Sequence, residues 1–450
     1  MVAADPHGIT TATRTGSLTR RALVGSALAA GTAAGLGSLS GCSGSASAAE
    51  RTRIQLWHLF TGGDGGVFQE MLQRVGAANP DLDIAPVVLT WGAPYYTKLA
   101  MASIGGRSPD LAVMHLTRIS GYAPGGLLEP WDPTKLAEHG ITADRFPQLL
   151  WERSHVDGQL FAIPLDFHAF VLFFNKAICS QAGVLGQDGM PAGLDSTAGF
   201  LDVAHRLADV TGDSGVSYGY TGDGAQMSRL FWGLYAQTGG VCELVPGQEA
   251  VFEPDKAVEV VTFVKDMLDG RAAKANLDYG AAVASFSTGR TGFTFMGNWE
   301  LQSYLSAGID VDAMPMPAVF GIPGTFGDSH VFVLPRQANV DPERRDAAYR
   351  VLAGMLENSL AWADGGHIPA DNGVRDSAAY RALVPQSHYA AAIEQAVFEP
   401  EAWFTGSGSD FQSRLGEVLQ GCWLGGTSPE QAVDGLVSRL NAALATQPPA

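Results

Sequence analysis

The chain has 450 residues, more than one hydrophobic core usually serves, so we expect two lobes of ordinary domain size. Apolar residues make up 46% of it, but beyond the first 41 residues no segment approaches the ~20 uninterrupted apolar residues that a membrane-spanning helix needs. The formal charge of −18 and the lack of a basic stripe argue against nucleic-acid binding, although acidity that merely keeps a protein soluble also explains this charge.

Residues 1–41 have the features of a signal peptide. Thr19-Arg20-Arg21 closes a charged, hydroxyl-rich leader, and a weakly hydrophobic run follows over Ala22–Ser40. The paired arginines resemble a twin-arginine export signal, but export by the Sec route is equally open.

The signal ends in Leu39-Ser40-Gly41-Cys42, which resembles a bacterial lipobox. We therefore predict that Cys42 is lipidated with diacylglycerol, whose two acyl chains anchor a protein to a membrane stably. The alternative is a chance cysteine in an alanine-rich signal. Residues 42–50 are small and polar and are expected to form a flexible tether on the outer face of the cell membrane.

Alternating elements follow the tether. A short strand around Ile54–Trp57 leads into a glycine-rich loop, a helix carries Val67–Val75, and a strand resumes over Ile84–Leu89. A second helix over Tyr95–Ile104 and a strand over Leu111–Met114 continue the alternation, which predicts a parallel sheet. The glycine-rich loop matches neither the P-loop nor the dinucleotide-binding spacing, so nucleotide binding is not expected.

Several sequence blocks in this order resemble extracellular solute-binding protein family 1, the type that includes maltose-binding protein and sugar-binding lipoproteins of ABC importers. The blocks in the first third are Leu56-Trp57-His58, Asn79–Ile84, Lys98-Leu99, Gly106–Leu111 and Gly125–Trp131. The resemblance continues through Asp157–Pro164, Val171–Lys176, Phe295–Trp299, Gly365–Ala370 and Ser428–Val433, so it spans nearly the whole mature chain.

The resemblance implies an α/β fold of the two-lobe periplasmic-binding-protein type II, with a hinge and an interlobe cleft. We place the first lobe at residues 51–164 plus 317–360 and the second at residues 165–316 plus 361–450. The implied function is capture of a carbohydrate, a mono- or oligosaccharide, and its delivery to a transmembrane ABC permease. We expect a monomer that needs no cofactor and catalyses no reaction.

A sugar site needs hydrogen-bonding groups beside flat rings, because hydroxyls lose water on binding and C–H faces pack on aromatic side chains. In open α/β sheets such groups come from loops that follow strands. The candidates near the first three strands are Trp57, His58, Phe60, Thr61 and His115. Trp57 fits burial in the core equally well.

Asp166 and His168 lie in the predicted hinge crossing, where a carboxylate between apolar strands is costly to bury without a partner. An internal ion pair is the alternative explanation of Asp166. Asn298, Trp299 and Glu300 follow a strand expected over Thr291–Met296, and the resemblance places the family's stacking aromatic at Trp299.

The remaining candidates come from three other segments. Gln226 and Arg229 stand ahead of Trp232, which itself fits an apolar helix face. Asp328 and His330 precede a strand expected over Val331–Leu334, and depart from a glycine-serine loop of the family. Trp403 lies in a loop rich in glycine and serine and is the last candidate; exposure or packing explains it as well.

Two other classes of function stay open from the sequence. A secreted glycan-active enzyme would use paired carboxylates such as Asp166 and Glu300. The same fold could also bind a polyol, polyamine, iron chelate or peptide, although the candidate residues fit a neutral or amino-bearing sugar best.

Histidines and cysteines raise two smaller questions. His58, His115, His168 and His330 are candidates to face one cleft, where we favour hydrogen bonding over a metal site. Cys179, Cys242 and Cys422 allow either one disulfide with a free thiol or three thiols.

Overall fold

The computed structural model describes residues 51–448. The predicted signal peptide, the lipidated Cys42 and the tether of residues 42–50 lie outside this range. Among the described residues, no helix is both long enough and apolar enough to span a membrane.

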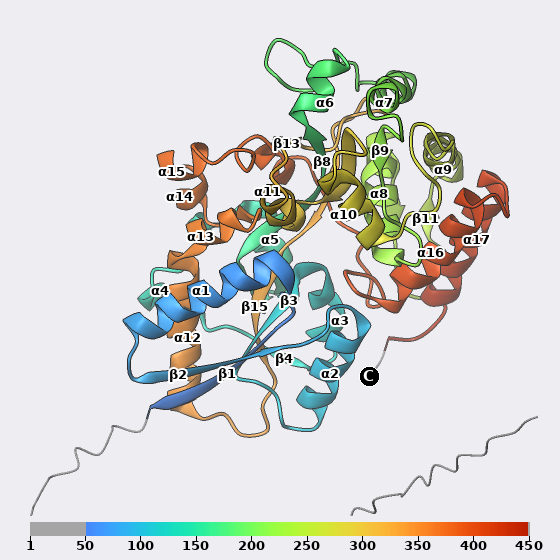
Figure 1. Ribbon diagram of the computed structural model, residues 1–450. Helices are drawn as coiled ribbons and strands as arrows, with labels where there is room; N and C mark the ends of the chain where they lie inside the picture. Colours follow the sequence, from blue (N-terminus) through green and yellow to red (C-terminus); the bar gives the residue numbers. More distant parts are fainter. Residues whose placement is uncertain (1–50, 449–450) are drawn as a thin grey trace, which may run out of the picture. The chain divides into compact units, whose positions relative to one another are not determined.

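A six-stranded sheet organises the part of the chain drawn in blue, cyan and orange in Figure 1. Its strand order is β2-β1-β3-β15-β4, and β7 pairs with β15. β1 is parallel to β2 and β3, whereas β15 runs antiparallel to its three partners. The strands are β1 Thr52–His58, β2 Leu82–Val88, β3 Leu111–His115, β4 Leu128–Glu129, β7 Ala162–Pro164 and β15 His330–Pro335.

A seven-stranded sheet is built around β8. Its order is β17-β14-β8-β12-β9, and β13 and β16 also pair with β8. The strands are β8 Asp166–Asn175, β9 Val216–Ser217, β12 Phe293–Gly297, β13 Val311–Met314, β14 Thr325–Asp328, β16 Ile368–Pro369 and β17 Ala396–Val397. Two small hairpins pair β5 His155–Val156 with β6 Gln159–Leu160, and β10 Cys242–Glu243 with β11 Val251–Phe252.

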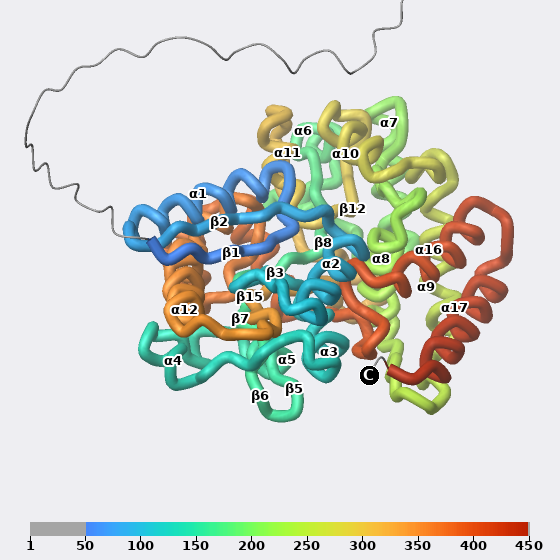
Figure 2. The backbone as a smooth tube through the Cα atoms, turned by 90° about the horizontal axis from the view of Figure 1, so that it is seen from below, coloured from blue at the N-terminus to red at the C-terminus, as the bar shows by residue number. Residues whose placement is uncertain are grey.

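Helices cover both sheets. α1 contacts β2, α12 contacts β1, and the pairs α8–α9, α16–α8 and α17–α9 pack side by side, as Figure 2 also shows. The first group of helices is α1 Gly62–Ala78, α2 Ala93–Ile104, α3 Ile119–Tyr122, α4 Pro133–Glu138, α5 Gln148–Arg153, α6 Lys176–Gln181, α7 Thr197–Thr211, α8 Gly224–Gln237 and α9 Pro254–Met267. The second group is α10 Tyr279–Ser287, α11 Leu301–Ser306, α12 Pro342–Glu357, α13 Ser359–Asp364, α14 Asn372–Arg375, α15 Ala378–Arg381, α16 Asp410–Trp423 and α17 Pro429–Leu444. Short 3₁₀ turns are η1 Leu116–Arg118, η2 Ala143–Arg145, η3 Asn298–Glu300 and η4 Ala390–Ile393.

The expected β-α-β arrangement at the start of the mature chain is confirmed, because β1 and β2 are parallel and α1 connects them. The expected glycine-rich loop is wrong in its second half, since α1 already begins at Gly62. Gly62 has φ of 74°, a conformation that glycine adopts without strain, and this lets the chain turn directly from β1 into the helix. Phe68, Met71 and Leu72 then anchor the helix in the core.

The loop expected at residues 327–330 is also wrong. β14 ends at Asp328 and β15 begins at His330, so only Ser329 separates the two strands. The switch is stable because the buried Asp328 carboxylate accepts hydrogen bonds from the hydroxyls of Thr117 and Ser407, which fix the chain where it passes from one sheet to the other. The strand expected over Thr291–Met296 is shifted to Phe293–Gly297.

All three cysteines of the described part are free thiols, which settles the question that the sequence left open for them. Cys179 and Cys422 are buried, and Cys242 is half-buried. Burial raises the pKa of the Cys179 and Cys242 thiols to about 12, so both are held in the unreactive protonated form. The boundaries between the two lobes stay a prediction.

Candidate functional site

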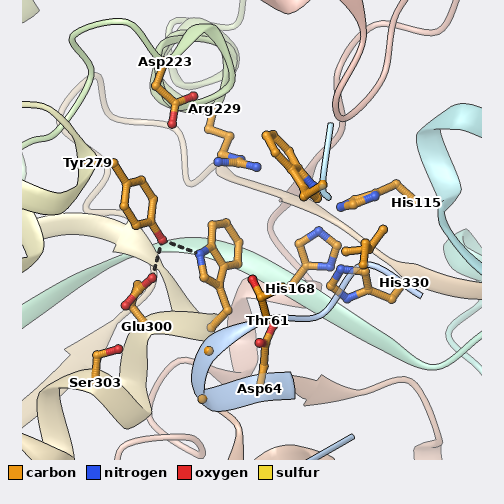
Figure 3. A pocket seen from close by; sticks show the side chains of 15 residues that line it. Thr61, Asp64, His115, His168, Asp223, Arg229, Tyr279, Glu300, Ser303 and His330 are labelled. Atoms are coloured by element: carbon orange, nitrogen blue, oxygen red, sulfur yellow. Dashed lines mark hydrogen bonds between the residues drawn. The ribbon is translucent and has the colours of Figure 1, made fainter. Parts of the chain in front are cut away.

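A cavity of about 360 Å³ lies where segments from the two sheets meet (Figure 3). The residues that line it are Leu59, Thr61, Gly62, Gly63, Asp64, Trp91, His115, His168, Asp223, Arg229, Tyr279, Trp299, Glu300, Ser303 and His330. They come from ends of strands and starts of helices, the positions at which an α/β sheet exposes side chains to a crevice.

The six-stranded sheet supplies one wall. Residues 59–64 leave β1 and open α1, and Trp91 follows β2. His115 is the last residue of β3 and His330 the first of β15, and these two residues are paired across the sheet. Their imidazoles are therefore neighbours, with ring centroids 4.8 Å apart.

The seven-stranded sheet and its helices supply the other wall. His168 comes from β8, Asp223 is the N-cap of α8, and Tyr279 is the first residue of α10. Trp299 and Glu300 form the turn after β12. A Cβ at Gly297 would lie 2.1 Å from the Trp299 indole, so only glycine lets this ring fold back over the end of the strand.

A hydrogen-bonded group holds the Trp299 ring in place. The indole Nε1 donates to the Tyr279 hydroxyl at 2.9 Å, and that hydroxyl donates to the Glu300 carboxylate (Figure 3). Burial, followed by the charge of Glu300, raises the pKa of Tyr279, so the phenol keeps its proton. An aromatic face and a carboxylate are thus fixed next to each other in the wall.

Arg229 places a buried cation between two tryptophans. Its guanidinium carbon lies 4.8 Å from the centroid of the Trp299 ring and 5.5 Å from that of Trp91. The side chain makes no ion pair or hydrogen bond within residues 51–448, although it is only 6% exposed. Burial lowers its pKa, while the charges of Asp223 and other nearby acids oppose that change. The guanidinium N–H groups are therefore available to a ligand.

Three histidines form the base of the cavity. The rings of His168 and His330 stack with centroids 4.0 Å apart, and His115 lies 5.2 Å from His168. His115 Nδ1 contacts the Tyr96 hydroxyl at 2.6 Å. Burial, together with the neighbouring imidazoles, lowers the pKa of His168 to about 3 and that of His115 well below its ordinary value. Burial therefore favours the neutral form of the His168 and His115 rings.

Asp166 lies directly behind the stacked histidines and is fully buried. Its carboxylate accepts hydrogen bonds from His168 Nδ1, the backbone N–H and Nδ1 of His330, and Trp362 Nε1. Burial alone would raise the pKa of Asp166, but His330, His367 and His168 hold it well below the ordinary value. Asp166 therefore orients the histidines and does not itself line the cavity.

A model of the family described as bacterial extracellular solute-binding protein matches residues 61–353. The chain belongs to this family. A similar curated protein is the maltotriose-binding protein of Pyrococcus abyssi (strain GE5 / Orsay), 23% identical over 273 residues. That match covers 59% of this chain and 54% of the relative, so it spans about half of the relative's length.

Solved structures agree with this solute-binding protein in fold. The GacH receptor of Streptomyces glaucescens GLA.O is 18% identical with a TM-score of 0.73, covering 87% of this chain and 99% of the receptor. Maltose-bound MalE3 of T. maritima is 16% identical with a TM-score of 0.73, covering 87% of this chain and 100% of MalE3. The predicted two-lobe α/β fold of solute-binding proteins is confirmed.

About half of the site residues predicted for this solute-binding protein line the cavity. They lie near the ends of strands or in the turns that follow them, except Arg229, which lies on the second turn of α8. They are Thr61, His115, His168, Arg229, Trp299, Glu300 and His330.

The candidates from the first strand, apart from Thr61, are packed into the core. Trp57 is 8% exposed and lies under Lys98, and Phe60 packs between Phe68 and Trp362. The His58 ring lies 4.7 Å from the Phe68 ring between centroids, tilted by 43°, and does not join the other three histidines. Burial lowers the pKa of His58 to about 4. His58 and Phe60 turn toward Phe68 of α1, because the helix must bury its apolar face on this side of the sheet. Trp57 points to the opposite face, toward Lys98 of α2.

Other candidates support the cavity or lie elsewhere. Asn298 Oδ1 accepts a hydrogen bond from the Ala169 backbone, and Gln226 is fully buried in α8 against Met296. Asp328 bonds Thr117 and Ser407 behind the cavity. Trp403 lines a separate groove with Arg118 and Tyr122.

The sequence prediction missed part of the wall of this solute-binding protein. The missed residues are Leu59, Gly62, Gly63, Asp64, Trp91, Asp223, Tyr279 and Ser303. Trp91 follows a predicted strand, and Asp223 precedes a helix at the distance of an N-cap, so both carried a signal. No local sequence signal marked Tyr279, because only long-range packing brings α10 to Trp299.

Proposed function

We propose that this protein captures a carbohydrate in the cavity and delivers it to a transmembrane permease of an ABC importer. The observation that carries the proposal is the pairing of the Trp91 and Trp299 rings with the carboxylates of Asp64, Asp223 and Glu300. Flat rings take the C–H faces of a sugar and carboxylates take its hydroxyls, so this wall replaces the water that a sugar loses. Relatives named for maltotriose, acarbose and maltose support the choice of class.

The size of the site favours more than one sugar unit. A second hollow of about 570 Å³ shares Trp91, Asp223 and Tyr279 with the cavity and continues along Gly92 and Gly408. A ligand held at Trp299 can therefore extend past Trp91 into this hollow. An oligosaccharide fits the two spaces together better than a monosaccharide does.

The proposed mechanism involves no covalent step. The two lobes, predicted at residues 51–164 plus 317–360 and 165–316 plus 361–450, close around the ligand, because contacts to both walls favour the closed state. A shift from 1% to 99% closed needs about 5.5 kcal/mol of differential binding, which a few charge-assisted hydrogen bonds and a stacked ring supply. The monomer would be exported and held at the membrane through the lipid on Cys42.

Calorimetric titration with mono- and oligosaccharides tests the proposal. Trp299→Ala should weaken binding of the best ligand about 10-fold or more, because it removes the stacking face. Trp403→Ala is the matched control, since Trp403 lies in a different groove, and it should bind as the wild type does. Thermal shift gives a second readout, because a ligand at 100 times its Kd stabilises by about 2.7 kcal/mol.

Two results would contradict the proposal. If no saccharide binds the folded protein, or if Trp403→Ala weakens binding as much as Trp299→Ala, the cavity is not the sugar site. The oligosaccharide should also be recovered intact after long incubation, because hydrolysis would favour the enzyme alternative.

Arg229 favours a second candidate, a sugar that carries an anionic group. A buried guanidinium without an ion pair is the group that recognises a carboxylate or phosphate in two-pronged geometry. Titration with a neutral sugar and its uronic acid distinguishes the two candidates. If the ligand is anionic, Arg229→Met should abolish a preference for the acid; if it is neutral, no such preference exists in the wild type.

A further inference from the structure

Four buried side chains converge beneath the floor of the cavity. Asp166 and His168 come from β8, His330 opens β15, and His367 immediately precedes β16. One potential ligand atom from each lies within 4.8 Å of the corresponding atoms of the other three. All four residues are between 0% and 4% exposed. Three separate segments of the chain therefore place three imidazoles and a carboxylate at one point.

The distances from the Asp166 carboxylate to the three imidazoles are close to the ligand–ligand spacing of a tetrahedral metal site. The Asp166 carboxylate lies 2.8 Å from His330 Nδ1, 3.0 Å from His367 Nδ1 and 3.2 Å from His168 Nδ1. Ligand atoms about 2.0–2.1 Å from a tetrahedral ion are about 3.3 Å from one another. Around an ion these three contacts would lengthen by a few tenths of an ångström, and any imidazole nitrogens that lie up to 4.8 Å apart would approach one another.

Hydrogen bonding among the described residues leaves the His367 ring poorly satisfied. A carboxylate has about four lone-pair positions. The four donors on Asp166, from His168, His330 and Trp362, already fill them. His367 is 0% exposed, with Nδ1 3.0 Å from Asp166 and Nε2 3.9 Å from Asp64. Within residues 51–448 neither nitrogen makes a contact with the geometry of a hydrogen bond. An unpartnered buried imidazole is costly, and a bound ion would account for it.

Contacts around the cluster resemble those that orient metal ligands. The backbone N–H of His330 and Trp362 Nε1 fix the carboxylate at 2.8 Å and 2.6 Å. The indole of Trp362 also stacks on the His367 ring with centroids 4.2 Å apart. Such outer contacts hold ligands in the geometry that an ion requires.

We propose that Asp166, His168, His330 and His367 bind one divalent transition-metal ion of the zinc type beneath the floor of the cavity. Three imidazole nitrogens and one carboxylate oxygen form a donor set that tetrahedral Zn²⁺ takes. Because His168 and His330 also line the cavity, the ion would fix part of the wall. The competing explanation is a metal-free cluster in which His367 is a buried imidazolium between Asp166 and Asp64.

Metal titration of the full chain, without added sugar, tests the site independently of the proposed function. The protein is purified without a polyhistidine tag, treated with a chelator and titrated with Co²⁺ and then Zn²⁺. We expect one Co²⁺ per chain, visible absorption bands of tetrahedral cobalt, and displacement of Co²⁺ by Zn²⁺. His367→Gln should weaken binding by about 100-fold or more, since it removes a direct ligand.

Matched variants keep the test decisive. His58→Gln is the control, because His58 is also buried with two unpartnered ring nitrogens but lies outside the cluster, and it should bind cobalt as the wild type does. His168→Gln provides a second ligand variant if His367→Gln does not fold. Wild-type protein that takes up no stoichiometric metal from micromolar solutions would overturn the proposal, as would ligand variants that bind like His58→Gln.

Discussion

The contribution of a single tyrosine hydroxyl to stability and ligand binding depends on the hydrogen bonds that it makes. The Tyr279 hydroxyl joins Trp299 to Glu300, whereas the buried Tyr304 hydroxyl, near Thr294, makes no contact of hydrogen-bond geometry within residues 51–448. Tyr279→Phe should lower the unfolding free energy by about 1 kcal/mol and weaken ligand binding several-fold, because Trp299 and Glu300 lose their common partner. Urea unfolding and calorimetric titration of the variant measure the two effects.

Tyr304→Phe is the matched control for this prediction. It removes a hydroxyl that lies outside the cavity wall and makes no well-aligned hydrogen bond in the described part of the chain, so stability should change little and ligand affinity should be unchanged. If Tyr304→Phe destabilises the protein as much as Tyr279→Phe does, the Tyr279 network has no special role.

At the scale of the element, we expect α8 to serve both the stability of the fold and the proposed ligand binding. Its N-cap, Asp223, accepts a hydrogen bond from the Gln226 backbone at 3.1 Å and also lines the cavity, and Arg229 lies farther along the same helix. Asp223→Asn keeps a good cap but removes the charge, whereas Asp223→Ala removes both. We expect both variants to lose ligand affinity, and only Asp223→Ala to lose about 1 kcal/mol of stability.

Parallel measurement of melting temperature and ligand affinity separates the two roles of Asp223. Equal stability of the alanine and asparagine variants would show that the cap contributes nothing. Unchanged affinity in both variants would remove Asp223 from the ligand-binding wall.

At the scale of the whole molecule, a buried acid makes stability depend on pH. Glu399 is 1% exposed, and its carboxylate accepts from Gln412 Nε2 at 2.8 Å. Burial, with a contribution from Asp328, raises the pKa of Glu399 from 4.5 to about 7, against the opposing effects of Gln412 and Arg118. The folded protein therefore holds this proton more tightly than the unfolded chain does.

The resulting stabilisation is complete below about pH 4.5 and is lost as the pH rises through about 7. Glu399→Gln should abolish this loss, so between pH 5 and pH 8 wild type should lose on the order of 3 kcal/mol relative to the variant. Urea unfolding at both pH values measures the difference. Glu401→Gln, at the exposed neighbouring position, should follow the wild type; parallel pH profiles of wild type and Glu399→Gln would contradict the prediction.

Local patterns in the sequence predicted the alternating start of the fold well, because apolar spacing in α1 and the β-rich segments around it reflects burial within a few residues. These predictions failed where contacts with distant segments of the chain determine the local structure. Phe60 turned into the core because Phe68 and Trp362 meet it there, and residues 327–330 formed strand ends because Thr117 and Ser407 bind Asp328. Tyr279 and His367 reach the site only through tertiary packing, which no local spacing reveals.

All ten residues of β8 are buried, and the strand pairs with β12, β13, β14 and β16. Its amide protons should therefore exchange with deuterium only when the whole protein opens. The base of the proposed binding site should therefore lie in the most slowly opening part of the chain, while Thr61 and Glu300 lie in turns next to it. Substitutions that change the ligand preference can consequently be confined to these turns, while β8 is left unchanged.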